Sequence, residues 1–320
     1  MKHIFRLIRL PNLIIIALTM VLMRYCIIQS IFKWYFINLE FPTYLFVLLV
    51  FTVVLIAAAG YMINDYFDVK TDLINRPDEV VIDKYIKASK VYNSYFVINF
   101  ISLCFAFYLS SRVGVVSMTF LFPLAMGLLW FYSTTYKKQL LTGNILVSLI
   151  IAGVPILVVL YEMPLVHSKY LHYPLAYNVL LKVVTIWCGT YAFFAFIINL
   201  IRELVKDIED FEGDMAYGRR TLPIAYGLKT SKIVVSVLIV IVIVGIEIVY
   251  VNLLEPNKLD LVTLIYFHLL LIIPLIAAGI FLFIANQKKH YTIIALIIKL
   301  VMVMGLLYAI VVRFKMLGQN

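Results

Sequence analysis

Charge is what this sequence has least of. Only 14% of its 320 residues are Asp, Glu, Lys or Arg, whereas 64% are hydrophobic and the mean hydropathy is +1.02. A soluble globular domain is nearer half apolar and a quarter charged. The composition therefore indicates a polytopic integral membrane protein, and no remaining stretch is long and polar enough for a soluble domain.

Cysteine and histidine are also scarce. The three cysteines lie singly in apolar runs, the five histidines are isolated, and neither C-x-x-C nor H-E-x-x-H occurs. Small buried thiols are therefore expected, and no zinc site is indicated. A cleavage site of small residues is missing after the basic start "MKHIFRLIRLPNL". The apolar run that follows is therefore predicted to be a first span rather than a signal peptide.

Long apolar runs dominate what is present. A transmembrane helix needs about 20 such residues, and nine runs qualify. They are residues 11–31, 43–63, 94–111, 113–132, 144–162, 177–201, 231–252, 261–284 and 291–312. We predict an all-α bundle of nine transmembrane helices in a single domain, residues 1–320. The two longest polar connections, 64–93 and 202–230, are predicted to be acidic loops.

Basic residues predict the orientation. The N-terminus and the connections after the even-numbered spans hold 18 of the 27 Lys and Arg residues. By the positive-inside rule, the N-terminus and both acidic loops are expected to be cytoplasmic, with the protein in the cell's inner or plasma membrane. Topology then accounts for the net charge of +10, and no nucleic-acid partner is indicated.

Acidic residues gather where orientation does not require them, because Asp and Glu contribute little to topology. Twelve of the seventeen lie in the two long connections and their helix junctions. Two triplets share one spacing at an offset of 142 residues: the first ladder, Asp65, Asp68 and Asp72, and the second ladder, Asp207, Asp210 and Asp214. Each ladder ends an even-numbered span, which predicts a duplicated four-helix unit. If helical, each ladder is a stripe of carboxylates on one face.

Carboxylate stripes of this kind suit Mg²⁺, which is typically held by one or two carboxylates together with substrate phosphates. Two facing stripes could hold two or more ions bridged by a diphosphate. The cations placed to bind its remaining oxygens are Arg76, Lys137, Lys206, Arg219 and Arg220. A merely solvated charged face and a Ca²⁺ or Na⁺ transport path are the alternatives. Transport ligands usually lie near the bilayer midplane, whereas these ladders lie at the membrane edge.

Motifs around the ladders resemble a known family. "NDYFDVKTDLINRP" and "DIEDFEGDMAYGRRTLP" are similar to the two signatures of the UbiA superfamily of intramembrane prenyltransferases. "YSTTYKKQLLTGN", residues 132–144, resembles its Y-S-x-x-L-K-x-x-x-x-x-G-N element, with Tyr136 in place of leucine, and "RLPNLI" resembles its R-x-x-N start. The resemblance covers essentially the whole chain and implies a UbiA-like helical bundle.

The resemblance also implies the chemistry, which is transfer of a prenyl group from an isoprenyl diphosphate to an acceptor with release of diphosphate. It implies metal ligands at Asn64, Asp68, Asp72, Asp207, Asp210 and Asp214. Asp68, Asp72, Asp210 and Asp214 are the expected catalytic residues. The expected substrate-binding residues are Arg9, Asn12, Arg76, Tyr132, Lys137, Lys206 and Arg219. Mg²⁺ is the implied cofactor, and the prenyl tail would lie among apolar helices and membrane lipids.

The acceptor stays open between two classes. "RELVKDIEDFEGD" and "GRRTLP" are most similar to the branch that makes archaeal-type ether lipids, the geranylgeranylglycerol-phosphate geranylgeranyltransferases. That branch implies geranylgeranyl diphosphate as donor and geranylgeranylglyceryl phosphate, a phospholipid precursor, as acceptor. After "NRP", however, this chain continues "DEVVIDKYIKASK" instead of the usual R-P-I-P-S-G. A lipophilic quinone precursor or a tetrapyrrole is therefore the alternative acceptor.

Two cations lie inside spans without a motif around them. Arg24 falls in the first apolar run and Lys299 in the last. We expect each to snorkel or to pair with another residue of the bundle, with a contact to substrate as the alternative.

Overall fold

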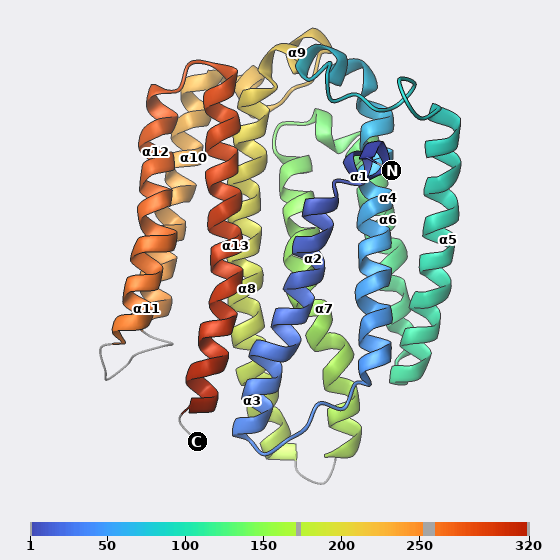
Figure 1. Cartoon of the computed structure of the whole chain (residues 1–320), viewed down its shortest axis with the longest axis vertical. Coiled ribbons are helices and arrows are strands. Elements are labelled where there is room, and N and C mark those ends of the chain that lie inside the picture. The colour runs from blue at the N-terminus through green and yellow to red at the C-terminus, as the bar shows by residue number, and fades with distance from the viewer. Residues whose placement is uncertain (1, 171–173, 252–259, 319–320) are drawn as a thin grey trace. The chain divides into compact units, whose positions relative to one another are not determined.

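A computed structural model describes residues 2–170, 174–251 and 260–318 of the chain (Figure 1). Within these ranges the chain is helical and contains no strand. The helices are α1 (Lys2–Leu7), α2 (Leu10–Leu22), α3 (Gln29–Trp34), α4 (Thr43–Asn75), α5 (Ala88–Val113), α6 (Leu121–Thr134), α7 (Thr142–Lys169), α8 (Pro174–Glu209), α9 (Phe211–Ala216), α10 (Leu222–Val249), α11 (Leu261–Tyr266), α12 (Ile273–Ile284) and α13 (Lys288–Gly318). Two π-helical turns, Met23–Ile28 and Phe267–Ile272, join α2 to α3 and α11 to α12. The short 3₁₀ helices are Val116–Phe120 and Tyr136–Lys138.

Nine helical segments of the described chain are long and apolar enough to cross a bilayer, which confirms the predicted number of spans. A membrane-spanning helix satisfies its backbone hydrogen bonds internally, so apolar runs of this length fold as helices. The third and fourth spans are joined by a short turn, because α5 ends at Val113 and Gly114 follows it with φ 81°. Residue 252, the predicted end of the seventh span, lies outside the described residues.

The predicted loop boundaries were wrong at both ladders. α4 continues from the predicted end at residue 63 to Asn75, about three further turns. α8 likewise continues beyond residue 201 to Glu209. The prediction failed because polar side chains ended each apolar run, although nothing in these stretches breaks a helix. Both helices therefore carry acidic residues past the apolar part of the span.

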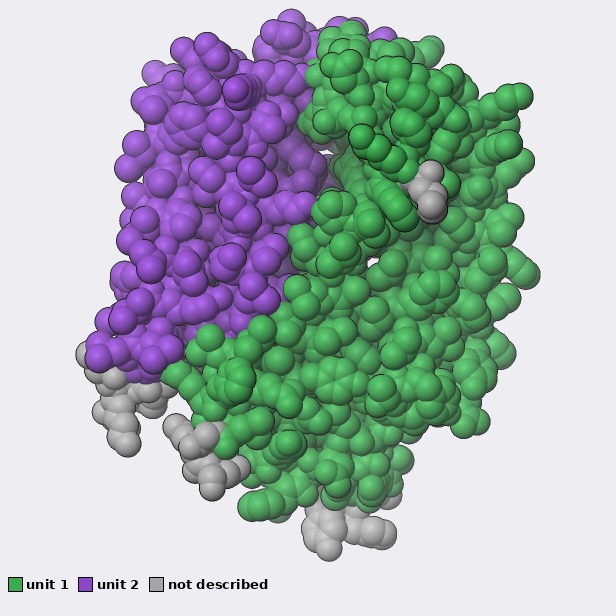
Figure 2. Space-filling view, viewed as in Figure 1, with its two compact units in different colours: residues 1–137, 152–192, 309–320 green, residues 138–151, 193–308 purple. Residues whose placement is uncertain are grey.

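The chain divides into two compact units, drawn in different colours in Figure 2. Unit 1 contains residues 1–137, 152–192 and 309–320, and unit 2 contains residues 138–151 and 193–308. In unit 1, α4 packs against α2, α5 and α6. A Cβ atom on Gly60 of α4 would lie 2.9 Å from Leu129 Cδ1 of α6. Any side chain at residue 60 would therefore require the end of the Leu129 side chain to move.

A buried ion pair closes the end of unit 1 remote from the first ladder. Arg24 and Glu162 are 1% and 0% exposed, and Arg24 Nε donates to Glu162 Oε2 at 3.3 Å. Glu162 Oε1 accepts the backbone N–H groups of Glu40 (2.7 Å) and Phe41 (2.9 Å). Arg24 also donates to the carbonyl of Phe41 and lies over the ring of Phe46. This confirms the prediction that Arg24 pairs within the bundle, and breaking such a pair costs about 3–5 kcal/mol.

Unit 2 is held together by packing between α10 and α12, which lie side by side in Figure 1. Hydrogen bonds of polar side chains link the ends of its helices. Lys232 Nζ donates to the carbonyl of Ala285 at 2.5 Å, and the hydroxyls of Thr263 and Tyr308 lie 2.7 Å apart. Because these groups are bonded to partners within the unit, little desolvation cost remains.

Candidate active site at the two acidic ladders

The first ladder lies on the last turns of α4, in unit 1. Because α4 is helical to Asn75, Asp65, Asp68 and Asp72 fall on one side of the helix. Asn64 and Asp68 are buried, at 6% and 3% exposure, whereas Asp65 and Asp72 are partly exposed. The expected carboxylate stripe is therefore present, with its central aspartate removed from water.

Lys137 brings two predicted ligand residues together. Its Nζ donates to Asn64 Oδ1 at 3.3 Å and forms an ion pair with Asp68 Oδ2. Lys137 belongs to the short 3₁₀ turn that follows α6, so the connection after the fourth span reaches the end of the second. The structure thus places Lys137, a predicted substrate-binding residue, beside the first ladder within unit 1.

Arg9 binds the first carboxylate of the ladder. Its Nη2 donates to Asp65 Oδ1 at 2.8 Å, and its guanidinium lies 5.1 Å from the ring centroid of Tyr61. Arg9 has φ 51°, a left-handed conformation that is strained for any residue but glycine, and it separates α1 from α2. The strained turn aims the side chain at α4. Asn12 lies in the first turn of α2, where its backbone N–H bonds to the carbonyl of Arg9 at 2.8 Å.

The segment after the first ladder is packed onto the unit. Arg76 follows the last residue of α4, and its N–H bonds to the carbonyl of Asp72 at 2.7 Å. Val81 and Ile82 are 5% and 3% exposed and form one apolar cluster with Leu7, Met62 and Val91. The stretch that departs from the family pattern therefore covers α1, α4 and α5. Tyr132, the predicted substrate residue of α6, is also buried, at 8% exposure.

The second ladder lies in unit 2 and is not one continuous helix. Asp207 belongs to α8, which ends at Glu209, and Asp210 takes a non-helical conformation (φ −94°, ψ 11°) before α9 carries Asp214. The single helical stripe considered from the spacing is therefore wrong for this ladder. The equal spacing misled because the chain turns between α8 and α9.

Two predicted substrate residues lie beside the second ladder. Arg219 Nη1 donates to Asp214 Oδ1 at 3.1 Å, and the two side chains are 7% and 4% exposed. Their backbones are also joined, by a bond from the N–H of Arg219 to the carbonyl of Asp214 at 3.0 Å. Lys206 Nζ lies 3.8 Å from Glu203 Oε1, and the same carboxylate oxygen lies 2.8 Å from Arg202 Nη1. Arg219 thus contacts a carboxylate of the second ladder itself.

Sequence reasoning missed Asn144 as a contact of the second ladder. Its Nδ2 donates to Asp207 Oδ2 at 2.7 Å. Behind it, Ser148 Oγ donates to the carbonyl of Asn144 at 2.6 Å, and Asn199 Nδ2 donates to Ser148 Oγ at 3.0 Å. The available signal was a set of polar residues inside apolar runs, with Asn144 and Ser148 one helical turn apart.

The donor set of the ladders fits Mg²⁺. Carboxylate and amide oxygens are its preferred protein ligands, and it is usually bound by only one or two carboxylates with phosphates and water. Within the described residues, no three His, Cys, Asp or Glu side chains converge into a cluster that could hold a metal by themselves.

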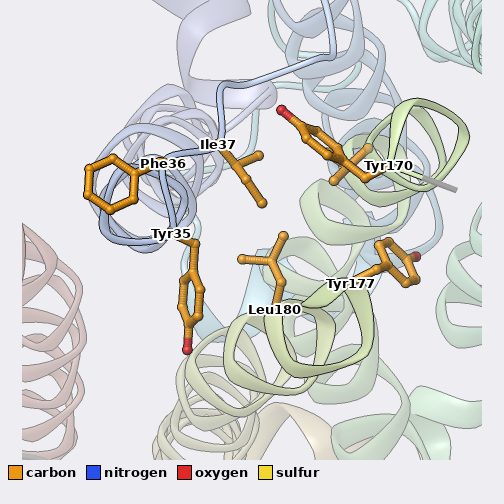
Figure 3. A pocket seen from close by; sticks show the side chains of 7 residues that line it. Tyr35, Phe36, Ile37, Tyr170, Tyr177 and Leu180 are labelled. Atoms are coloured by element: carbon orange, nitrogen blue, oxygen red, sulfur yellow. The ribbon is translucent and has the colours of Figure 1, made fainter. Parts of the chain in front are cut away.

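A pocket of unit 1 lies apart from the first ladder. It has a volume of about 200 Å³ and is lined by Tyr35, Phe36, Ile37, Val166, Tyr170, Tyr177 and Leu180. Figure 3 shows tyrosine and aliphatic side chains around it, with the ring of Phe36 pointing away. Three of its lining residues lie in the chain before α4, and the other four lie at the end of α7 and in the first turns of α8. The first ladder lies at the opposite end of the 33-residue α4. The pocket is therefore not part of the candidate site.

Comparison with known proteins connects this geometry to a family. The family model described as the UbiA prenyltransferase family matches residues 30–292. A digeranylgeranylglyceryl phosphate synthase of Methanobrevibacter smithii is 30% identical over 67% of this chain and 69% of its own length. Those of Pyrococcus horikoshii and Sulfurisphaera tokodaii are 35% and 28% identical, over 59% and 75% of this chain and 60% and 76% of their own lengths.

Solved structures share the fold at low identity. One, described as giving insights into the biosynthesis of digeranylgeranylglyceryl phosphate synthase in membranes, aligns with 98% of both chains at a TM-score of 0.60 and 22% identity. The apo structure of a UbiA homolog from Aeropyrum pernix covers 95% of this chain and 96% of its own at a TM-score of 0.60 and 14% identity. A UbiA homolog from Archaeoglobus fulgidus, bound to DMAPP and Mg²⁺, covers 96% and 99% at 0.50 and 14%.

Proposed function

The chain belongs to the UbiA prenyltransferase family, and from this premise we propose that it transfers a geranylgeranyl group from geranylgeranyl diphosphate to geranylgeranylglyceryl phosphate. Magnesium is the proposed cofactor, and diphosphate is the second product. The bond between the allylic carbon and the diphosphate oxygen breaks, a bond from that carbon to the acceptor hydroxyl oxygen forms, and the hydroxyl proton is released.

One observation carries the proposal. The single ammonium group of Lys137 contacts both Asn64 and Asp68, two residues of α4 that are predicted to bind metal. The ammonium group is suited to bind phosphate oxygens. The carboxylate of the buried Asp68 and the amide oxygen beside it are suited to bind a metal ion. Together they fit a phosphate group that carries a metal ion. At the second ladder, Arg219 supplies the corresponding charge beside Asp214.

The residues proposed to bind Mg²⁺ are Asn64, Asp68, Asp72, Asp207, Asp210 and Asp214. When bound, the metal would stabilise the negative charge that develops on the diphosphate as it leaves. Lys137, Arg76, Lys206 and Arg219 are proposed to bind the remaining diphosphate oxygens. Arg9 and Asn12, near the start of α2, and Tyr132 of α6 are proposed to contact the substrates.

The choice of acceptor rests on the relatives. The three named above are digeranylgeranylglyceryl phosphate synthases, whose product carries two geranylgeranyl groups on glyceryl phosphate. The metal and donor class are supported by the homolog bound to DMAPP and Mg²⁺. The apolar helices beside the ladders offer a dry surface to a prenyl tail, where a carbocation would survive longer than in water.

An acceptor panel tests the proposal. Purified protein, Mg²⁺ and labelled geranylgeranyl diphosphate would be incubated with geranylgeranylglyceryl phosphate, 4-hydroxybenzoate, dihydroxynaphthoate or a chlorophyllide, and products identified by mass. We expect a diether product from the first acceptor. An aromatic or tetrapyrrole product would replace the acceptor and retain the mechanism. The proposed function would be contradicted by the absence of both product and released diphosphate.

Removing one ladder charge should abolish most turnover. Asp68→Asn and Asp210→Asn keep the side-chain shape but remove a negative ligand, and we expect kcat/KM to fall about 10²–10³-fold. Glu79→Gln is the matched control, because Glu79 follows the same ladder but its side chain is exposed. Its Oε1 lies 3.7 Å from Nη2 of Arg6, which is also exposed. The measurement is the steady-state rate of diphosphate release. Full activity of the Asp68→Asn, Asp210→Asn double variant would contradict the role of the ladders.

A further inference from the structure

A buried chain of hydrogen bonds ends at the first carboxylate of the second ladder. It runs from Asn199 of α8 to Ser148 of α7 (3.0 Å), then to the carbonyl of Asn144 (2.6 Å), and from the amide of Asn144 to Asp207 (2.7 Å). All four residues belong to unit 2. The chain thus links two helices and returns to α8 at Asp207.

The supporting residues are shielded from water. Asn144, Ser148 and Asn199 are 6%, 0% and 3% exposed. Placing polar side chains inside a membrane span costs free energy unless each is hydrogen-bonded. Ser148 bonds to the backbone carbonyl of Asn144, and Asn199 of α8 bonds to Ser148. These two bonds therefore fix the backbone of α7 at Asn144 against α8, and from there the amide of Asn144 reaches Asp207.

Ser148 can be compared with another serine that is fully buried in a helix. Ser102, also 0% exposed, donates to the carbonyl of Ile98 one turn back in α5 at 2.8 Å. Ser148 makes the same local bond, which uses its hydroxyl hydrogen, and its oxygen then accepts the amide of Asn199. The donor and acceptor roles along the chain are therefore fixed by chemistry.

The equivalent carboxylate of the first ladder is bound by a different group. Asp65 is paired with Arg9, a full positive charge, at 2.8 Å. Asp207, offset from it by 142 residues, receives a neutral amide from Asn144. The amide donates one directed hydrogen bond to a single carboxylate oxygen, so it orients the Asp207 side chain.

We propose that Asn144 is a positioning residue for metal binding, which, supported by Ser148 and Asn199, holds the carboxylate of Asp207 in the orientation that binds Mg²⁺. This inference rests on the proposed function, in which Asp207 is a ligand. Groups that orient metal ligands in this way typically change metal affinity 10- to 100-fold when removed.

The test measures metal binding directly. Mn²⁺ would be titrated into purified protein with inorganic pyrophosphate, and free ion followed by electron paramagnetic resonance. We expect Asn144→Ala to weaken Mn²⁺ binding about 10- to 100-fold. The Mg²⁺ concentration for half-maximal prenyl transfer should rise by a similar factor, with kcat largely recovered at saturating Mg²⁺. Ser148→Ala, which removes only the support, should shift both values in the same direction by less.

Controls separate positioning from folding. Ser102→Ala removes an equally buried hydroxyl outside the chain of bonds and should leave Mn²⁺ affinity unchanged. Thermal unfolding of every variant without metal reports purely structural damage. Wild-type Mn²⁺ affinity in both Asn144→Ala and Ser148→Ala would overturn the positioning role, even if their unfolding temperatures fell. Failure of the wild-type protein to bind Mn²⁺ or transfer a prenyl group would instead contradict the proposed function.

Discussion

At the scale of single residues, four of the six ladder carboxylates meet four different partners. Lys137 binds Asp68, Arg9 binds Asp65, Arg219 binds Asp214 and Asn144 binds Asp207. Charge-assisted contacts of this kind are stronger than neutral ones. They set these four carboxylates in defined positions before a substrate arrives.

The contribution of Lys137 to activity can be measured against that of Lys138, the next residue in the chain. We expect Lys137→Met to raise the KM for the prenyl diphosphate and lower kcat/KM about 10- to 100-fold, since a hydrogen bond to a charged group contributes about 1.5–3 kcal/mol. Lys138→Met is the control, because Lys138 is exposed and uses only its backbone carbonyl, which accepts the N–H of Arg220 at 2.9 Å. Steady-state kinetics with both variants check this. Equal kinetics for the two variants would contradict a specific role for Lys137.

At the scale of elements, the backbone departs from regular helical geometry near the ends of some helices. α4 stays regular through its ladder, whereas α8 stops between Asp207 and Asp210. After Arg219, α10 begins at Leu222 with a proline in its first turn, but Gly227 interrupts it with φ 86° and ψ 159°. This region of backbone space is essentially restricted to glycine. The first turn of α10 is therefore set off from the rest of the helix.

Replacing Gly227 should cost stability through the backbone alone. A Cβ atom there would meet nothing within 4 Å, so the expected loss of about 1–3 kcal/mol in Gly227→Ala comes from the disallowed backbone conformation. Gly305→Ala in α13 is the matched control, because its Cβ also meets nothing within 4 Å and the backbone there is helical. We expect that control to be neutral or stabilising. Thermal unfolding in detergent distinguishes them, and equal unfolding temperatures would contradict the strain at Gly227.

At the scale of the whole molecule, the helices make the protein an integral membrane protein, and its orientation stays a prediction. The basic residues place the connection after the second span in the cytoplasm and the connection after the first span on the other side. Lys84 and Phe36 lie in these two connections and are both exposed, Phe36 by 97%.

Labelling of single cysteines tests this orientation. In a cysteine-free background, Lys84→Cys should react with a membrane-impermeant maleimide only in inside-out vesicles, and Phe36→Cys only in right-side-out vesicles. Cys104 must be replaced first because it is exposed. The opposite pattern would place the ladders outside the cytoplasm and contradict the prediction from charge.

The sequence by itself determined the nine spans and the family, and the metal chemistry of the two ladders stays a prediction from it. Each of these depends on residues close together in the chain: about 20 apolar residues for a span, eight residues for a ladder. The helical continuation of α4 was missed because polarity, rather than a helix-breaking residue, marked the predicted end.

Only the tertiary structure decided which side chains meet. Arg9 and Asp65 are 56 residues apart, Asn144 and Asp207 are 63 apart, and Arg24 and Glu162 are 138 apart. Helices that are apolar on nearly every side do not reveal from sequence which face packs against which neighbour. Rotating a helix by one residue would turn Asn144 away from Asp207 without changing the hydropathy of the span. The partners of buried polar residues are therefore set by helix packing.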